Sequence, residues 1–210
     1  MPNGWQSQAT AYDQQLAVFI PAEWKIDLTP EVYPAIDYIR RSDLFAQDEP
    51  PLLKLDATAL RDAIASRKYT TLAVTSAYAT SAALAQQSTN CLSNCFLQEA
   101  KERAKWLDEQ MEAKGHWGPL HGVPISVKCT YSLAGHYLSC GCLTDVSKPV
   151  QKEDSVIISI LRAGGGGGGG NFMATTAIPQ SIMHLETDSF LGHTLNPHNS
   201  KLSPGGSSGG

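Results

Sequence analysis

The chain has 210 residues, of which 42% are hydrophobic and 17% are charged, so it carries enough apolar surface to close a core. Its formal net charge of -4 argues against a nucleic-acid partner, because such proteins need a basic face to neutralise phosphates. No stretch offers the roughly 18 apolar residues of a membrane span. The first ten residues also lack the basic flank and apolar stretch of a signal peptide.

The number of cysteines is odd, and a chain of this length does not need disulfides for its stability. A reducing compartment fits best, and we therefore predict a cytoplasmic location. The C-x-C pair has no partner pair, and the histidines show no HExxH spacing, so we expect neither a metal site nor a cofactor. The five cysteines are Cys91, Cys95, Cys129, Cys140 and Cys142.

The first part of the chain, residues 1–50, is polar and interrupted by prolines and shows few periodic runs. It predicts an extended or short-helical arm that wraps around a larger body formed by residues 51–210. Asp56 is typical of the residue that caps a helix, which should continue to about Ser66.

Helices and short apolar runs alternate after the arm. Thr70 or Thr71 should cap an alanine-rich helix that ends near Gln86, and a short β-prone run follows. Residues 97–114 show apolar positions at spacings of three and four, which predicts an amphipathic helix that Gly115 ends. These apolar positions are Leu97, Ala100, Ala104, Leu107 and Met111.

The second half of the chain continues this alternation. Residues 123–128 predict a buried strand with Pro124 at its start. Asp154 should cap a helix over residues 155–163. Helices that alternate with short apolar strands favour an α/β fold.

Residues 164–170 are a run of seven glycines. Each glycine in an ordered element costs about 0.5–1 kcal/mol relative to alanine, so the whole run would cost about 5 kcal/mol. A phosphate-binding loop is excluded because no Gly-Lys-Ser/Thr follows. The run predicts a flexible low-complexity loop or an artefact in the sequence.

Two features could carry chemistry. Lys128 ends an apolar strand, where lost solvation favours the neutral amine that can act as a general base, although a lysine at a strand end can also simply reach solvent. Residues 205–210 read GGSSGG. This hexapeptide allows the backbone to approach a ligand closely, but it also has the composition of a flexible linker.

Together and in this order, these features resemble the amidase signature family, most closely the fungal acetamidases and more distantly the fatty acid amide hydrolases. The resemblance spans about residues 20–210. Its motifs are GPLHGVPISVK, EDSVIISILR, Pro179-Gln180, Glu186-Thr187-Asp188 and TLNPHNSKLSPGGSSGG.

The resemblance implies an α/β fold with a mixed, twisted β-sheet flanked by helices, of which residues 51–210 form the N-terminal portion. It also implies a Ser-Ser-Lys triad, with Lys128 as the neutral general base and Ser207 as a bridging serine that follows a cis peptide bond. Ser208 would hydrogen-bond within the loop, with Gly205, Gly206 and Gly209 as supporting glycines. Ile182 stands where a substrate contact is expected, or is an ordinary core isoleucine.

The family's acylated serine lies downstream of GGSSGG, so we expect no nucleophile within this chain. Cys129 stands where the family usually has aspartate. Glycines replace much of a strand that relatives have within residues 162–176, so we expect that strand to be lost and the lysine site to be loosened.

The resemblance implies a hydrolase that converts a small carboxylic amide to acid and ammonia through an acyl-enzyme, with a small-molecule amide as partner and possible homo-oligomers. The alternative is a catalytically inactive, truncated amidase fragment with at most an interaction role.

Overall fold

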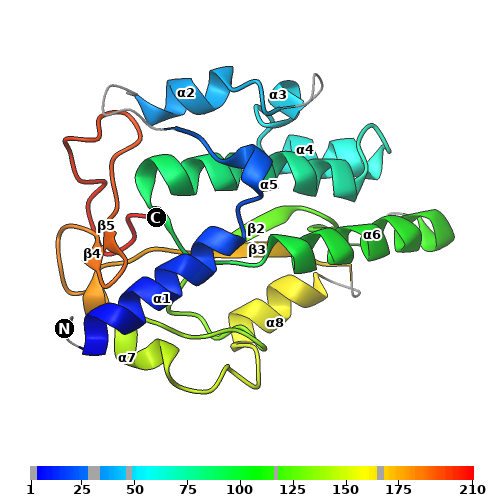
Figure 1. Ribbon diagram of the computed structural model, residues 1–210. Helices are drawn as coiled ribbons and strands as arrows, with labels where there is room; N and C mark the ends of the chain where they lie inside the picture. Colours follow the sequence, from blue (N-terminus) through cyan, green and yellow to red (C-terminus); the bar gives the residue numbers. More distant parts are fainter. Residues whose placement is uncertain (1–3, 28–33, 46–48, 116–117, 165–167) are drawn as a thin grey trace.

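Helices and a small mixed sheet build the computed structural model in Figure 1, which describes residues 4–27, 34–45, 49–115, 118–164 and 168–210. The helices are α1 (Gly4–Val18), η1 (Ala22–Trp24), α2 (Ala35–Arg41), α3 (Glu49–Leu52), α4 (Ala57–Ala65), α5 (Thr71–Thr89), α6 (Leu97–Lys114), α7 (Leu143–Val146), α8 (Val156–Ala163) and η2 (Gln180–Ile182). The strands are β1 (Leu92–Cys95), β2 (Pro124–Lys128), β3 (Asn171–Thr176), β4 (Asp188–Ser189) and β5 (Gly192–His193).

The main sheet has the order β1-β3-β2, with β1 antiparallel and β2 parallel to the central β3. The predicted α/β fold with a mixed sheet and flanking helices is therefore confirmed. Strand β3 also corrects the sequence analysis, which expected this strand to be lost. It is present, and it pairs with β2 along the whole of β2, from Pro124 opposite Asn171 to Lys128 opposite Thr176.

Apolar side chains extend from both faces of this sheet and pack against other elements. On one face, Met173 and Ala174 pack with Ala79 of α5 and Ala100 of α6. On the other face, a second cluster contains Phe96, Val127, Leu133, Phe172 and Ile158 of α8. Figure 1 shows this arrangement, with α5 and α6 on one side of β2 and β3 and α8 on the other. The sheet is thus the middle layer of a three-layer packing.

Several helices begin where the sequence predicts, although α5 continues to Thr89, beyond the predicted end near Gln86. The Asp56 side chain accepts a hydrogen bond from Ala59 N at 2.8 Å and caps α4, and Thr70 accepts from Ala73 N at 3.1 Å and caps α5. Helix α6 has the predicted bounds, and Gly115 ends it. Its five predicted apolar positions are all buried: Leu97, Ala100, Ala104, Leu107 and Met111.

Two local predictions were wrong. The first residues were expected to be extended or short-helical, but α1 is a helix of 15 residues, whose Tyr12 hydroxyl donates to Ser93 O at 3.0 Å. Asp154 does not cap α8. Its carboxylate instead accepts hydrogen bonds from Ala134 N and from the Arg162 guanidinium, both at 2.8 Å, so it ties the start and end of α8 to the preceding loop.

The glycine run is ordered where the structure describes it, so the prediction of a flexible loop is wrong for Gly164 and for residues 168–170. Gly164 ends α8 in a left-handed conformation, and residues 168–170 are buried. A side chain on Gly169 would overlap the carbonyl oxygens of Leu161 and Arg162, so only glycine fits there. Residues 165–167 lie outside the described part of the chain.

Asp108 joins the two long helices. Its carboxylate accepts hydrogen bonds from Thr71 N at 2.6 Å and Leu72 N at 2.9 Å, so a residue of α6 satisfies free amide groups at the N-terminus of α5. Among the described residues, no helix combines the length and the apolar character needed to cross a bilayer.

We expect Asp108→Ala to lower the free energy of unfolding by about 2 kcal/mol, because two charge-assisted hydrogen bonds to amide groups are lost. Urea denaturation followed by circular dichroism measures this change. Glu109→Ala is the matched control, since Glu109 is the next residue of α6 and is exposed. It should change the stability by less than about 0.5 kcal/mol. Equal effects of the two substitutions would contradict the role given to Asp108.

Candidate active site

Lys128 and Ser207 are brought together from distant parts of the sequence. Lys128 is the last residue of β2 and is half-buried, next to the buried Val127. Its Nζ donates a hydrogen bond to Ser207 Oγ at 3.2 Å. Because β2 pairs in parallel with β3, the position of the lysine is set by the register of the two strands.

The loop that carries Ser207 is held by hydrogen bonds at several points. Thr187 Oγ1 donates to Gly205 O at 2.7 Å, Ser203 Oγ accepts from Gly205 N at 3.0 Å, and Gly210 N donates to Ala177 O at 3.0 Å. The peptide bond between Gly206 and Ser207 is cis. The loop is therefore an ordered part of the structure, unlike a flexible linker.

The glycines of this loop are required by close packing. A side chain on Gly206 would overlap the carbonyl oxygen of His184, and one on Gly209 would overlap the Thr187 side chain. Gly205 has open space around it but adopts a φ of 91°, which favours glycine for a different reason. All three predicted supporting glycines thus have a structural cause.

Two other predicted residues behave differently. Ser208 is exposed, and the hydrogen bond expected of its hydroxyl within the loop does not occur among the described residues. Ile182 is 44% exposed with a φ of 58°, so it is not a core isoleucine. Ile182 also does not line the cavity described below, although its neighbours Gln180 and Met183 do.

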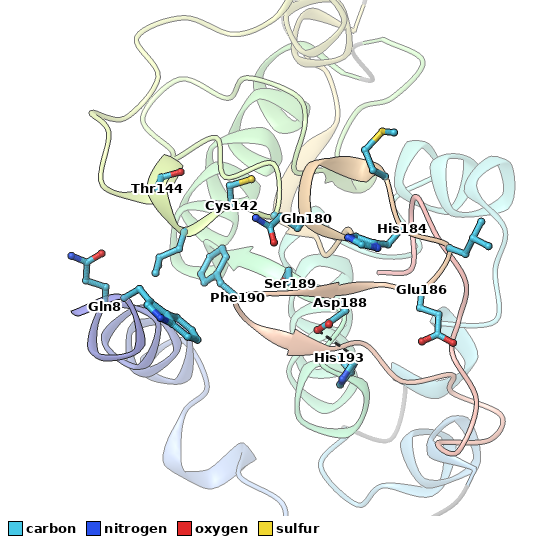
Figure 2. Close-up of a pocket in the computed structure, with 15 residues that line it drawn as sticks. Gln8, Cys142, Thr144, Gln180, His184, Glu186, Asp188, Ser189, Phe190 and His193 are labelled. Carbon is cyan, nitrogen blue, oxygen red and sulfur yellow. Dashed lines mark ion pairs between the residues drawn. The ribbon is translucent and has the colours of Figure 1, made fainter. Parts of the chain in front are cut away.

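A cavity of about 850 Å³ lies beside the loop, and Figure 2 shows the side chains that line it. Its walls come from the start of α1, from the loop that leads into α7, from the segment after β3 and from the hairpin of β4 and β5. Within the hairpin, His193 Nδ1 lies 3.5 Å from Asp188 Oδ1. Sequence reasoning missed the contribution of α1, because Trp5 and Gln8 belong to no motif.

Two backbone connections join the cavity to the Lys128–Ser207 pair. Cys140 N donates to the carbonyl oxygen of Cys129, the residue after Lys128, and Cys140 O accepts from Ser181 N at 3.0 Å. On the other side, Gly206 packs directly against the backbone of His184 and Leu185, which line the cavity. The cavity wall and the pair thus share the same supporting backbone.

The Cys140 thiol near the site is poorly suited to act as a nucleophile. Burial, together with the nearby Cys129 and Asp145, raises the pKa of the Cys140 thiol. Cys129, which stands beside the lysine, is buried. Because the thiolate is the reactive form, a raised pKa keeps Cys140 unreactive near neutral pH. Among the described residues, no group of three or more histidine, cysteine or acidic side chains could hold a metal ion.

The chain is similar to several known amidases. A model of the Amidase family matches residues 73–210. The chain is 36% identical to an acetamidase of Emericella nidulans over 212 aligned residues, which cover 100% of this chain and 38% of the relative. It is 38% identical to a putative amidase of Schizosaccharomyces pombe, with 98% of this chain and 39% of the relative covered.

Solved structures agree with the sequence matches. A fatty acid amide hydrolase superposes with a TM-score of 0.89 at 32% identity, over 99% of this chain and 37% of that one. A peptide amidase from Stenotrophomonas maltophilia shares the fold, with a TM-score of 0.66 at 22% identity. The chain thus spans less than two-fifths of the length of these relatives. With its sheet, its serine loop and the match over residues 73–210, the chain belongs to the amidase signature family.

Proposed function

We propose that Lys128 and Ser207 are the proton-transfer half of a Ser-Ser-Lys site that hydrolyses small carboxylic amides to acid and ammonia. The single observation that carries this proposal is the 3.2 Å hydrogen bond between Lys128 Nζ and Ser207 Oγ, in a chain of the amidase family. A serine hydroxyl is a weak nucleophile at neutral pH and needs an adjacent base, and a neutral lysine amine can supply one.

In the proposed reaction, the acylated serine lies outside these 210 residues. Its hydroxyl attacks the amide carbon, and its proton passes to Ser207 Oγ while the Ser207 proton passes to the neutral Lys128 amine. The resulting ammonium returns a proton through Ser207 to the departing nitrogen, so that ammonia leaves and an acyl ester remains. Water then hydrolyses the ester by the same relay, which regenerates both serines and the neutral amine.

A second candidate is a catalytically inactive amidase fragment with at most an interaction role. The observation that favours it concerns the nucleophile: among the described residues, Ser207 Oγ is the hydroxyl to which Lys128 Nζ donates a hydrogen bond, and our proposal assigns this serine to the relay. The substrate, the cytoplasmic location and any homo-oligomer of the whole protein remain predictions.

We expect Lys128→Ala to lower kcat/KM for acetamide by at least about 100-fold in an active protein that contains these residues, because the general base is lost. Steady-state release of ammonia measures the rate. Lys152→Ala is the control, since Lys152 is an exposed lysine on another loop and should leave the rate unchanged. A Lys128→Ala variant with an unchanged rate would rule out the proposed role.

The 210-residue chain alone should hydrolyse acetamide no faster than a buffer blank, because the proposal places the nucleophile outside it. The same ammonia assay at high protein concentration tests this. Turnover by this chain that Ser207→Ala abolishes would contradict the expectation, because a nucleophile would then have to lie within these residues.

Thr187 is a positioning residue in this proposal, since it is buried and its hydroxyl holds Gly205 O. We expect Thr187→Val, which keeps the shape and removes the hydroxyl, to lower kcat about 10-fold with little change in KM, because one lost buried hydrogen bond lets the loop shift. Thr187→Ser keeps the hydroxyl and should retain most of the rate. If valine and serine reduced kcat equally, the hydrogen bond would not be the cause.

A further inference from the structure

Strand β1 contains one residue more than its pairing with β3 needs. Leu92 lies opposite Thr176 and Asn94 lies opposite Thr175, so Ser93 between them is the extra residue of a β-bulge. A bulge re-aims a side chain relative to regular pairing, and bulges are frequent beside active sites. Ser93 is 3% exposed, so its hydroxyl has to find its partners inside the protein.

The Ser93 hydroxyl belongs to a buried chain of hydrogen bonds. Its Oγ lies 2.8 Å from Thr175 Oγ1 and donates to Thr176 O at 3.3 Å. A serine hydroxyl has one proton, so when this proton goes to Thr176 O, the Thr175 hydroxyl is the donor of the other bond. Thr176 O also accepts a hydrogen bond from Cys129 N at 3.4 Å. Two donors from different segments thus meet at one carbonyl oxygen at the end of β3.

This carbonyl oxygen lies next to the proposed general base. Thr176 is the last residue of β3, and Lys128 is its partner on β2. Cys129, which bonds to Thr176 O, directly follows Lys128 in the chain. The bond from Ser93 to Thr176 O therefore helps to fix the backbone from which the Lys128 side chain reaches Ser207.

The residue before β1 also reaches the serine loop. Cys91 O accepts a hydrogen bond from Ala177 N at 2.8 Å, and Ala177 O accepts one from Gly210 N at 3.0 Å. A shift at residues 91–93 would therefore move the end of β3 relative to the lysine and the serine loop together.

Helix α1 holds the backbone of the bulge. The Tyr12 hydroxyl donates to Ser93 O at 3.0 Å, and Tyr12 is 8% exposed. Burial raises the pKa of Tyr12 to about 12, so this hydroxyl keeps the proton that it donates. Ser93 is thus fixed through its carbonyl and through its side chain at the same time.

We propose that Ser93 is a positioning residue for the reaction, because its hydroxyl holds Thr176 O and thereby sets the position of Lys128 Nζ relative to Ser207 Oγ. This inference rests on the proposed function, since it concerns the base of that same site. Ser93 acts through the backbone of β3 and not on the substrate. Its loss should therefore slow the reaction of a bound amide and leave the binding of the amide nearly unchanged, because proton transfer requires the two atoms to stay within hydrogen-bond reach.

We expect Ser93→Ala to lower kcat for acetamide about 10-fold in an active protein that contains these residues, with a change in KM of less than about 2-fold. Steady-state release of ammonia measures both constants. Ser88→Ala is the matched control, since Ser88 is also buried and its hydroxyl donates to Leu84 O at 2.7 Å within α5. The control removes a buried hydroxyl away from the site and should leave kcat unchanged. Equal losses of kcat in the two variants would overturn the inference.

The partner hydroxyl separates hydrogen bonding from packing. Thr175→Val keeps the shape and removes the hydroxyl that bonds to Ser93, so kcat should fall about 3-fold. Thr175→Ser loses a methyl group but keeps the hydroxyl and should retain most of the rate. The double variant Ser93→Ala/Thr175→Val should be little slower than Ser93→Ala, because both substitutions remove the same bond. Losses that multiply in the double variant, or equal losses with valine and serine, would contradict the role of the hydroxyl pair.

Amide hydrogen exchange in the 210-residue chain tests the inference without catalysis. Ser93→Ala should speed the exchange of the Cys129 amide about 10-fold relative to the amide of Ala104, a buried residue of α6, because the acceptor Thr176 O is held less firmly. Ser88→Ala should leave this ratio unchanged. If the two amides were accelerated equally in Ser93→Ala, the hydroxyl would support only the global stability, and the inference would be wrong.

The two measurements separate this inference from the proposed function. Local acceleration at Cys129, in a protein without hydrolysis that depends on Lys128, would reject the proposed function and support the effect of Ser93 on the position of the lysine. Hydrolysis that depends on Lys128 but keeps its kcat in Ser93→Ala would support the proposed function and reject the inference.

Discussion

A buried amide side chain joins the central strand of the sheet to the two long helices, α5 and α6, that cover one of its faces. Asn171 begins β3 and is 1% exposed, and its Nδ2 donates hydrogen bonds to Thr75 Oγ1 of α5 and Ala100 O of α6, both at 2.9 Å. Leaving a buried donor unpaired is costly, so these two bonds of Nδ2 favour one position for β3 against the helices, while Oδ1 of the same side chain has no partner among the described residues. The position of the central strand β3 is therefore set by contacts that do not involve the residues of the candidate site.

The positions of the site residues follow from that strand. Because β3 pairs with β2 up to Thr176, its placement determines where Lys128 emerges at the end of β2. The serine loop is attached to the residues just after β3, because Gly210 N donates a hydrogen bond to Ala177 O. Base and serine loop are thus attached to the same strand, which explains how residues far apart in sequence keep a 3.2 Å contact.

Periodicity and capping residues predicted α4, α5 and α6 well, because local spacing and cap chemistry decide those helices. The pairing of Lys128 with Ser207 came only from the family resemblance, since neither residue has a local signal. Sequence reasoning failed where tertiary packing overrides local preference. It missed β3 after the glycine run, where buried neighbours compensate for the glycines, and it missed α1, whose Tyr12 is held by the distant Ser93. Four segments that are separate in the sequence line the cavity, so no local sequence pattern predicted it.

The contact between Thr187 and Gly209 has a consequence for how this sequence can change over time. The two positions compete for one small volume, since any side chain at 209 would occupy the space of the threonine. A larger residue at 209 requires a smaller one at 187, a larger residue at 187 cannot be compensated because glycine is already the smallest residue, and the threonine must keep its hydroxyl for Gly205. Very few pairs of residues therefore fit at positions 187 and 209 together. We expect substitutions at these two positions to depend on each other.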